Sequence, residues 1–300
     1  MVISIKENES DRKAGKNTPF KRALIGSGVV LAVLILIVAA YLLDYYRADS
    51  DALKMVHGIN EEFIITESDD YYTFAPNKIS TTAFIFYPGA KVQCEAYAPL
   101  LGRIAEQGIT CYLLKVPANM AILDIYAAAK VRAENDTIKH WFIGGHSMGG
   151  MVSGKYVFST DDDYEGIILL GSYVADDIEN KDMRALLIYG DKDGVLNHER
   201  YEESKKYLPD FDEYVIKGGC HAYFGAYGEQ RGDGTPTISC EEQIDLTSQE
   251  ICEWIDKELE GDATQLKRVA KGEENEGQQE VFMFIAKCIL NYRALRMFGR

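Results

Sequence analysis

Residues 141–150 read WFIGGHSMGG. An apolar run typical of a buried strand leads directly into Ser147, which stands between Gly145 and Gly149. A serine on a sharp strand-to-helix turn has a strained backbone that lifts its Oγ clear of the sheet, and the close approach of neighbouring chain leaves room only for glycine. The stretch therefore predicts an α/β sheet with a nucleophilic serine at the end of one strand. The alternative is a tight turn without chemistry.

Short apolar runs and longer helical patterns alternate along the chain. The runs read as strands are 63–66, 83–87, 109–114, 140–145, 166–171, 185–190 and 213–219, and the helical patterns are 95–107, 119–135, 148–159, 197–208 and about 241–260. Strands that are apolar throughout and are followed by helices indicate a mostly parallel sheet with helices on both faces. Only 13 residues, 172–184, separate two of the strands, so we expect no large cap domain.

A serine hydroxyl needs a base and an acid that orients the base. The loop after strand 185–190 presents Asp191 and Asp193, and the loop after strand 213–219 presents His221. Both loops follow carboxyl ends of strands, where sites of open α/β sheets form. The residues leave either aspartate open as the acid.

The backbone N–H of Met148 lies at a predicted helix N-terminus, where it can stabilise an oxyanion. The loop after strand 83–87 should supply a second donor, with Ala90 preferred to Lys91. We expect the neighbouring His146 to point away from the site. The tripeptide Arg231-Gly232-Asp233 matches a cell-adhesion motif, but it lies inside the loop that follows His221.

The charge of the chain is unevenly distributed. Residues 1–22 carry a net charge of +3 and the remaining residues carry −18, which gives the total of −15. An acidic body of this kind excludes nucleic-acid binding. Residues 23–43 contain no charge, and about 20 apolar residues suffice to cross a bilayer. We expect a single-pass anchor in the cell membrane, with residues 1–22 cytoplasmic and the rest extracytoplasmic, because Lys and Arg stay inside. A cleaved signal peptide is the alternative.

The expected organisation is a cytoplasmic segment 1–22, a transmembrane helix 23–43, a linker 44–60, a catalytic domain 61–260 and a tail 261–300 with a basic apolar end at 281–300. The cysteines form no CxxC pattern, so we expect no metal site. Chemistry by a serine, a histidine and an acid needs no other cofactor, so we expect none. Cys220 and Cys240 flank one glycine-rich loop and are the pair best suited to a disulfide.

Several motifs resemble the α/β-hydrolase superfamily and, within it, the bacterial alpha/beta hydrolase fold-5 group related to dienelactone hydrolases. They are YPGAKV (87–92), EAYAPL (95–100), KVPAN (115–119), GGHSMGG (144–150), YGDKDGV (189–195) and GGCHAYFGAYGEQRGDG (218–234). The resemblance implies Ser147 as nucleophile, His221 as base and Asp193, rather than Asp191, as acid. Dienelactone hydrolases carry cysteine where this chain has Ser147, so their substrate is not transferred.

The sequence as a whole predicts an α/β-hydrolase fold behind one transmembrane helix. The expected activity is a serine hydrolase that cleaves a carboxylic ester or similar acyl bond, on a small molecule or on envelope material. The alternatives are an acyltransferase or peptidase acting on the cell envelope, and a non-catalytic binding protein on the same fold. The oligomeric state is left open.

Overall fold

The computed structural model describes residues 18–58 and 60–271, with side chains described for 23–58 and 60–261. The strands form one sheet in the order β1-β2-β4-β3-β5-β6-β7-β8. Their bounds are β1 (Phe63–Glu67), β2 (Tyr71–Pro76), β3 (Thr82–Tyr87), β4 (Thr110–Leu114), β5 (His140–His146), β6 (Gly166–Leu170), β7 (Arg184–Gly190) and β8 (Phe211–Ile216). All pairs from β4 to β8 are parallel, whereas β1 and β2 run antiparallel to their neighbours.

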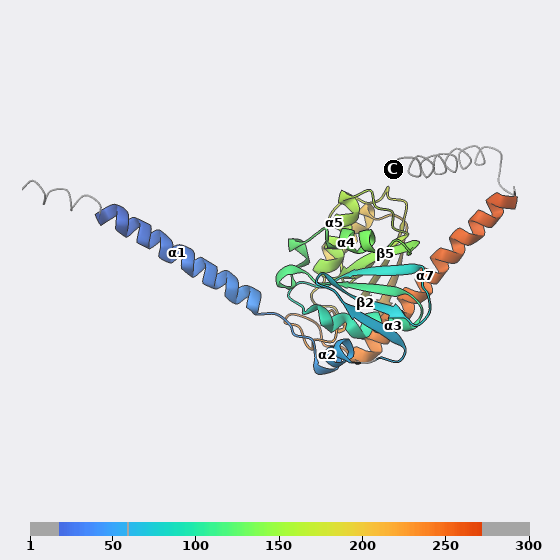
Figure 1. Ribbon diagram of the computed structural model, residues 1–300, viewed down its shortest axis with the longest axis horizontal. Coiled ribbons are helices and arrows are strands. Elements are labelled where there is room, and N and C mark those ends of the chain that lie inside the picture. The colour runs from blue at the N-terminus through green and yellow to red at the C-terminus, as the bar shows by residue number, and fades with distance from the viewer. Residues whose placement is uncertain (1–17, 59, 272–300) are drawn as a thin grey trace, which may run out of the picture.

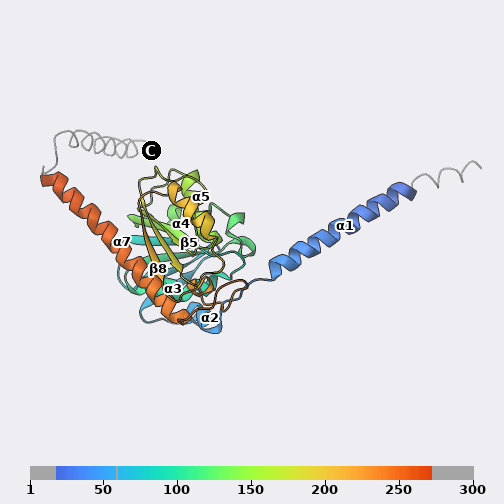
Figure 2. The same cartoon turned by 180° about the vertical axis from the view of Figure 1, so that it is seen from behind.

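Helices cover both faces of the sheet, as the alternating pattern predicted (Figures 1 and 2). On one face lie α3 (Ala98–Glu106) and α7 (Cys240–Lys271), with α2 (Ser50–His57) packed on α3. On the other lie α4 (Ala127–Glu134), α5 (Met148–Ser159) and α6 (His198–Ser204). Short 3₁₀ turns complete the chain: η2 (Cys94–Tyr97), η3 (Pro117–Asn119), η4 (Ala121–Leu123), η5 (Lys205–Tyr207) and η6 (Ala222–Phe224).

Strand β3 illustrates how the core is divided between the two faces. Successive side chains of a strand point to opposite faces. Phe84 and Phe86 therefore join the core beneath α3 and α7, while Ile85 and Tyr87 join the core beneath α4 and α5. Burial of each such side chain stabilises the fold by about 1.5–3 kcal/mol, which explains why the central strands are apolar throughout.

All the strands that the sequence predicted are formed, and no helix or strand lies between β6 and β7 in residues 171–183, so the expected absence of a cap domain agrees with the structure. Strand β2 was not predicted, because its sequence YYTFAP mixes polar and apolar residues and ends in proline. The helix predicted over 119–135 is shorter: it begins at Ala127 and follows η3 and η4. Ala118 and Asn119 have positive φ, which excludes a regular helix there.

The segment 44–60, predicted as a linker, is packed on the domain instead. Tyr46 pairs with Val92 as an isolated parallel bridge, and α2 buries Ala52 and Val56. The carboxylate of Asp49 caps α2 by accepting the N–H groups of residues 51 and 52. At the other end, α7 continues to Lys271, into the predicted tail; residues 272–300, including the basic end 281–300, lie outside the described part of the chain.

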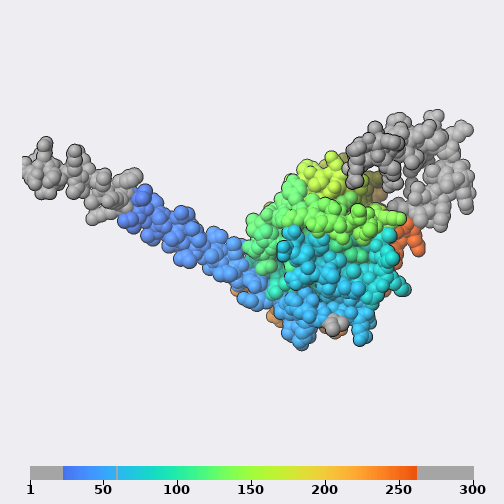
Figure 3. Space-filling view, viewed as in Figure 1, coloured from blue at the N-terminus to red at the C-terminus, as the bar shows by residue number. Residues whose placement is uncertain are grey.

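The first helix, α1 (Thr18–Leu43), extends from the domain as a separate rod (Figure 1). Its stretch Ala23–Leu43 is long and apolar enough to span a membrane, and none of it is buried inside the molecule. Figure 3 shows that its C-terminal end meets the domain at one side, and the contact there is with η3.

Candidate active site

Ser147 occupies the turn between β5 and α5 that the sequence predicted. Its backbone has φ 54° and ψ −121°, a conformation that non-glycine residues rarely adopt. A Cβ added at Gly145 or at Gly149 would collide with the carbonyl oxygen of Tyr87. The flanking glycines are therefore required because β3 passes directly beneath the turn. Ser147 itself is partly exposed.

The segment after β6 fixes the turn in place. The N–H of Ser147 donates to the carbonyl of Leu170 at 2.9 Å, and the hydroxyl of Ser172 donates to the carbonyl of Ser147 at 2.6 Å. Between these two contacts lies Gly171, with φ +50°. A Cβ at Gly171 would lie 2.9 Å from Nδ1 of His221 and 3.1 Å from Oδ2 of Asp193. One three-residue segment thus contacts both the serine turn and the His–Asp pair.

His221 and Asp193 form a buried pair. The Nδ1 atom of His221 lies 2.7 Å from Oδ2 of Asp193, and both side chains are almost fully buried. The other carboxylate oxygen of Asp193 accepts the N–H groups of Val195 and Leu196 at 2.9 and 2.7 Å. These contacts fix the carboxylate, which in turn fixes the imidazole.

The second imidazole nitrogen of His221, Nε2, has no hydrogen-bond partner in the described part of the chain, and Ser147 Oγ does not bond to it in this structure. A buried imidazole that is held by a carboxylate on one side and unbonded on the other has the arrangement expected of a base ready to accept a proton.

The structure distinguishes between the two aspartates that the residues alone left open. Asp191 does not contact His221; its Oδ1 accepts the N–H of Gly218 at 2.7 Å. Asp191 therefore joins the loop after β7 to the loop after β8, and Asp193 is the partner of the imidazole.

The backbone N–H groups of Ala90 and Met148 have no hydrogen-bond acceptor among the described residues. Gly89 donates to the hydroxyl of Tyr97 at 3.0 Å and Lys91 donates to the carbonyl of Asn119 at 2.7 Å, whereas no acceptor within the described residues takes the N–H of Ala90 between them. Met148 is the first residue of α5, and its N–H is equally unbonded. Of the two predicted second donors, Ala90 is therefore free to act and Lys91 is not.

His146 does not point away from the site, contrary to expectation. It is buried, its Nδ1 lies 2.8 Å from the hydroxyl of Tyr97, and its ring centroid lies 4.5 Å from that of His221. Burial, and next the proximity of His221, lower the pKa of His146 well below its usual value. The side chain is therefore a neutral support under His221.

Asp233 is the residue that sequence reasoning missed most clearly. Its carboxylate accepts the N–H groups of Gly194, His221 and Ala222 at 3.1, 3.1 and 2.8 Å, and that of Gly234. Burial alone would raise the pKa of Asp233, but these backbone donors outweigh it and lower the pKa. One side chain thus ties the loop that carries Asp193 to the residue that carries the imidazole. In the sequence, Asp233 belongs to a tripeptide that matches an adhesion motif. The only signal of its structural role was the proximity of its carboxylate to two glycine-rich loops.

Cys220 and Cys240 are both free thiols, so the predicted disulfide is not formed. The Sγ of Cys240 lies instead 3.6 Å from the carbonyl of Gly225. Burial raises the pKa of each thiol to about 12, so neither is a reactive thiolate near neutral pH. No group of three or more potential metal ligands is found among the described residues, and Cys288 lies outside them.

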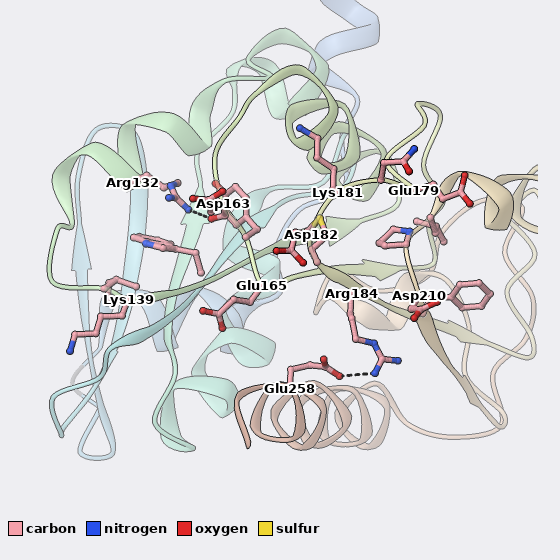
Figure 4. A pocket seen from close by; sticks show the side chains of 18 residues that line it. Arg132, Lys139, Asp163, Glu165, Glu179, Lys181, Asp182, Arg184, Asp210 and Glu258 are labelled. Carbon is pink, nitrogen blue, oxygen red and sulfur yellow. Dashed lines mark hydrogen bonds and ion pairs between the residues drawn. The ribbon is translucent and has the colours of Figure 1, made fainter. Parts of the chain in front are cut away.

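A cavity of about 1150 Å³ lies at the opposite edge of the sheet (Figure 4). It is lined by residues at or near the amino ends of strands, such as Trp141, Glu165 and Arg184. The charges around it are engaged with one another: Arg184 pairs with Glu258, and Arg132 donates to the carbonyl of Asp163. Glu165 is paired with His140 at 2.6 Å, and the cavity lining contains none of the predicted site residues.

A serine turn after β5, an acid after β7 and a histidine after β8 on a mostly parallel sheet define an α/β-hydrolase fold. The sequence matches the alpha/beta hydrolase family over residues 83–245, more than half of the chain, and the chain belongs to that family. The matched range contains Ser147, Asp193, His221 and Asp233.

Solved structures share the same fold. A hormone-sensitive lipase from a metagenome library superposes with a TM-score of 0.52 at 14% identity, covering 75% of this chain and 98% of its own. The Francisella virulence factor BioJ gives 0.51 at 15% identity, covering 69% and 88%, and an esterase of Pyrobaculum calidifontis gives 0.50 at 15%, covering 68% and 89%. No curated protein matches the sequence. Two of these three neighbours are an esterase and a lipase; at these identities the likeness shows the fold alone.

Proposed function

We propose that the protein is a membrane-anchored serine hydrolase that cleaves a carboxylic ester or similar acyl bond. The observation that carries the proposal is the buried pair of His221 and Asp193, in which Nε2 of His221 is unbonded. Segment 170–172 contacts both this pair and the turn that carries Ser147. Catalytic hydrogen bonds commonly tighten only when substrate is bound, so a rotation of the serine side chain completes the set.

In the proposed mechanism, Oγ of Ser147 attacks the carbonyl carbon while Nε2 of His221 takes the hydroxyl proton. Asp193 keeps the imidazole in the tautomer that exposes Nε2 as acceptor and stabilises the imidazolium that forms. The N–H groups of Met148 and Ala90 bind the negative oxygen of the tetrahedral intermediate. The proton then passes to the leaving alcohol, and water hydrolyses the acyl-enzyme by the same route.

The anchor and its orientation belong to the same proposal. The stretch Ala23–Leu43 is uncharged, and most of its large side chains are between about half and nearly three quarters exposed. Such a surface is stable in hydrocarbon and costly in water. The basic residues precede the helix, which favours a cytoplasmic N-terminus and an extracytoplasmic domain.

Labelling with a fluorophosphonate probe tests the nucleophile. We expect the full chain and the Ser159→Ala variant, which changes an exposed serine at the far end of α5, to be labelled equally. Ser147→Ala should abolish labelling and ester hydrolysis, and His221→Ala should reduce both. Undiminished labelling of Ser147→Ala would refute the assignment.

Protease digestion of intact spheroplasts and of inverted vesicles tests the topology. Residues 44–300 should be degraded in the first preparation and protected in the second. Release of the domain from membranes by alkaline carbonate, with loss of residues 1–43, would indicate a cleaved signal peptide instead.

A further inference from the structure

The connection between α1 and the domain is very short. Two residues, Asp44 and Tyr45, separate Leu43 at the end of the apolar helix from Tyr46. Tyr46 is fixed by backbone hydrogen bonds: its N–H donates to the carbonyl of Lys91 at 2.7 Å, and its carbonyl accepts the N–H of Gln93 at 2.9 Å. An extended chain spans about 3.6 Å per residue, so this part of the domain lies within roughly 11 Å of the end of the membrane helix.

The part of the domain that is held there is the loop of the active site. Lys91 directly follows Ala90, the proposed oxyanion donor. Its Nζ lies 3.3 Å from Oδ2 of Asp44 and 4.3 Å from the ring centroid of Tyr41. The hydroxyl of Tyr46 also accepts the N–H of Arg231, in the loop that contains Asp233. The loop after β3 and the loop after β8 are therefore both attached to the residues that directly follow α1.

Exposed apolar side chains lie on the next loop at the carboxyl edge of the sheet. The segment after β4 contains Ile122, Leu123 and Tyr126, which are 48%, 59% and 55% exposed. Its turn η3 contacts α1, its residue Asn119 accepts the N–H of Lys91, and its turn η4 packs against α5, the helix that Ser147 precedes. We call these three residues the apolar loop patch.

The backbone at this junction is fixed in an unusual conformation. Lys91, Ala118 and Asn119 all have positive φ although none is glycine. Strain of this kind is retained where the surrounding structure over-determines it, and it is concentrated at functional sites. The apolar loop patch therefore lies on a loop whose backbone conformation is fixed.

We infer that the apolar loop patch inserts into the bilayer interface beside α1, and that the substrate is an ester of a membrane lipid. The inference rests on the proposed serine hydrolase and on its anchor. Single exposed apolar residues are ordinary, but three within five positions, next to a short membrane tether, match the interfacial side chains of membrane-bound proteins. The ester carbonyl of a lipid lies at the boundary between headgroups and acyl chains, and the tether keeps the loop that carries Ala90 close to the end of the apolar helix, near that boundary.

Hydrolysis of such a lipid ester requires no reactant other than water. The Ser147 Oγ forms a bond to the acyl carbon, and the bond between that carbon and the oxygen of the lipid alcohol breaks. The serine proton reaches the departing oxygen through His221. Water then releases a fatty acid and regenerates the serine.

Insertion is tested with the full chain in vesicles of dioleoylphosphatidylcholine that contain brominated phosphatidylcholine. Leu123→Trp places a fluorophore in the patch, and Phe158→Trp is a matched control at the far end of α5; the native Trp141 and Trp254 are buried. We expect strong quenching of the tryptophan at 123 and none of that at 158. Equal or absent quenching at 123 would overturn the insertion, whatever the catalytic result.

Substrate class is tested with the double variant Ile122→Ser, Leu123→Ser against the control Ile79→Ser, Phe158→Ser, which removes exposed apolar residues at the opposite edge. The probes are dioleoylglycerol in the same vesicles and p-nitrophenyl acetate in solution. The activity of the patch variant on dioleoylglycerol should fall at least about tenfold, because its serine side chains do not insert into the apolar part of the bilayer. Its activity on the acetate should stay within about twofold, as should both activities of the control.

Parallel loss of both activities in the patch variant, or no loss of either, would overturn the inference about substrate. Ser147→Ala separates this inference from the proposed function. If that variant retains hydrolysis, the proposed nucleophile fails, and the quenching result still decides whether the patch is inserted.

Discussion

The ring centroids of His146 and His221 lie 4.5 Å apart, and only one of these imidazoles has the environment of a base. His221 is paired with the carboxylate of Asp193, which fixes the orientation of its ring. His146 is buried against the hydroxyl of Tyr97 and the ring of Phe224, and no carboxylate contacts it in the described part of the chain. The proposed mechanism places a transient positive charge on His221, and a charged His146 at this distance would repel it, so that mechanism requires His146 to remain neutral.

The depressed pKa of His146 predicts a pH dependence of stability. Burial, then His221, place the folded-state pKa below the unfolded value of about 6.5. Between these two pKa values the unfolded chain binds a proton that the folded chain does not, so the free energy of unfolding falls as pH falls. The expected slope is about 1.4 kcal/mol per pH unit. Urea unfolding at several values from about pH 7.5 down to 5 measures it.

The control is His146→Gln, whose amide does not titrate. Its absolute stability is expected to be lower, but its dependence on pH over the same range should be shallower than that of the native protein by about that slope. Identical slopes in the two proteins would show that folding does not lower the pKa of His146.

The two aspartates after β7 should differ sharply in their effect on catalysis. In Asp193→Asn the amide can no longer hold the imidazole tautomer that exposes Nε2 as acceptor, so kcat should fall by about three to four orders of magnitude. Asp191→Asn keeps an oxygen for the N–H of Gly218, and its loss should stay below about tenfold. Steady-state kinetics on p-nitrophenyl acetate compare them, and equal losses would contradict the assignment of the acid.

The fold was largely readable from the sequence because its determinants are local. Apolar runs, glycine positions and the order of Ser147, an aspartate and His221 along the chain depend on neighbouring residues or on the known edge of a parallel sheet. The choice of Asp193 came from a resemblance, since both aspartates follow the same strand.

The supporting residues could not be predicted because each acts across a long sequence separation. Tyr97 meets His146 only after β3, η2 and β5 are packed, and Asp233 reaches Gly194 only when two loops fold over one another. The linker was misread for the same reason: Tyr46 pairs with Val92, and a single polar segment does not reveal a distant backbone partner.

Asp233 should act as a positioning residue. Asp233→Ala leaves the N–H groups of Gly194, His221 and Ala222 without their acceptor, which should destabilise the protein by about 1–3 kcal/mol. Asp233 acts on the reaction only by positioning His221, so its loss should lower kcat about tenfold or more. It does not contact the substrate, so KM should stay nearly constant.

Asp233→Asn is the conservative comparison, because its amide retains one acceptor oxygen. Its kcat and its free energy of unfolding should lie between those of the native protein and Asp233→Ala. If Asp233→Ala loses stability but keeps its kcat at a temperature where it is fully folded, the role is structural only.

The strained backbone of Ser147 predicts that this serine lowers stability. At φ 54° and ψ −121° a side chain costs about 1–3 kcal/mol, and only glycine avoids the clash. Ser147→Gly should therefore unfold with a free energy about 1 kcal/mol higher than Ser147→Ala, although both variants lack the nucleophile. Ser153 lies inside α5, where glycine is the weaker helix former, so Ser153→Gly should be about 1 kcal/mol less stable than Ser153→Ala. Urea unfolding of the four variants measures both differences. If the difference in free energy of unfolding between the glycine and alanine variants has the same sign at both positions, the turn stores no strain. The argument that backbone strain lifts Oγ of Ser147 clear of the sheet would then fail.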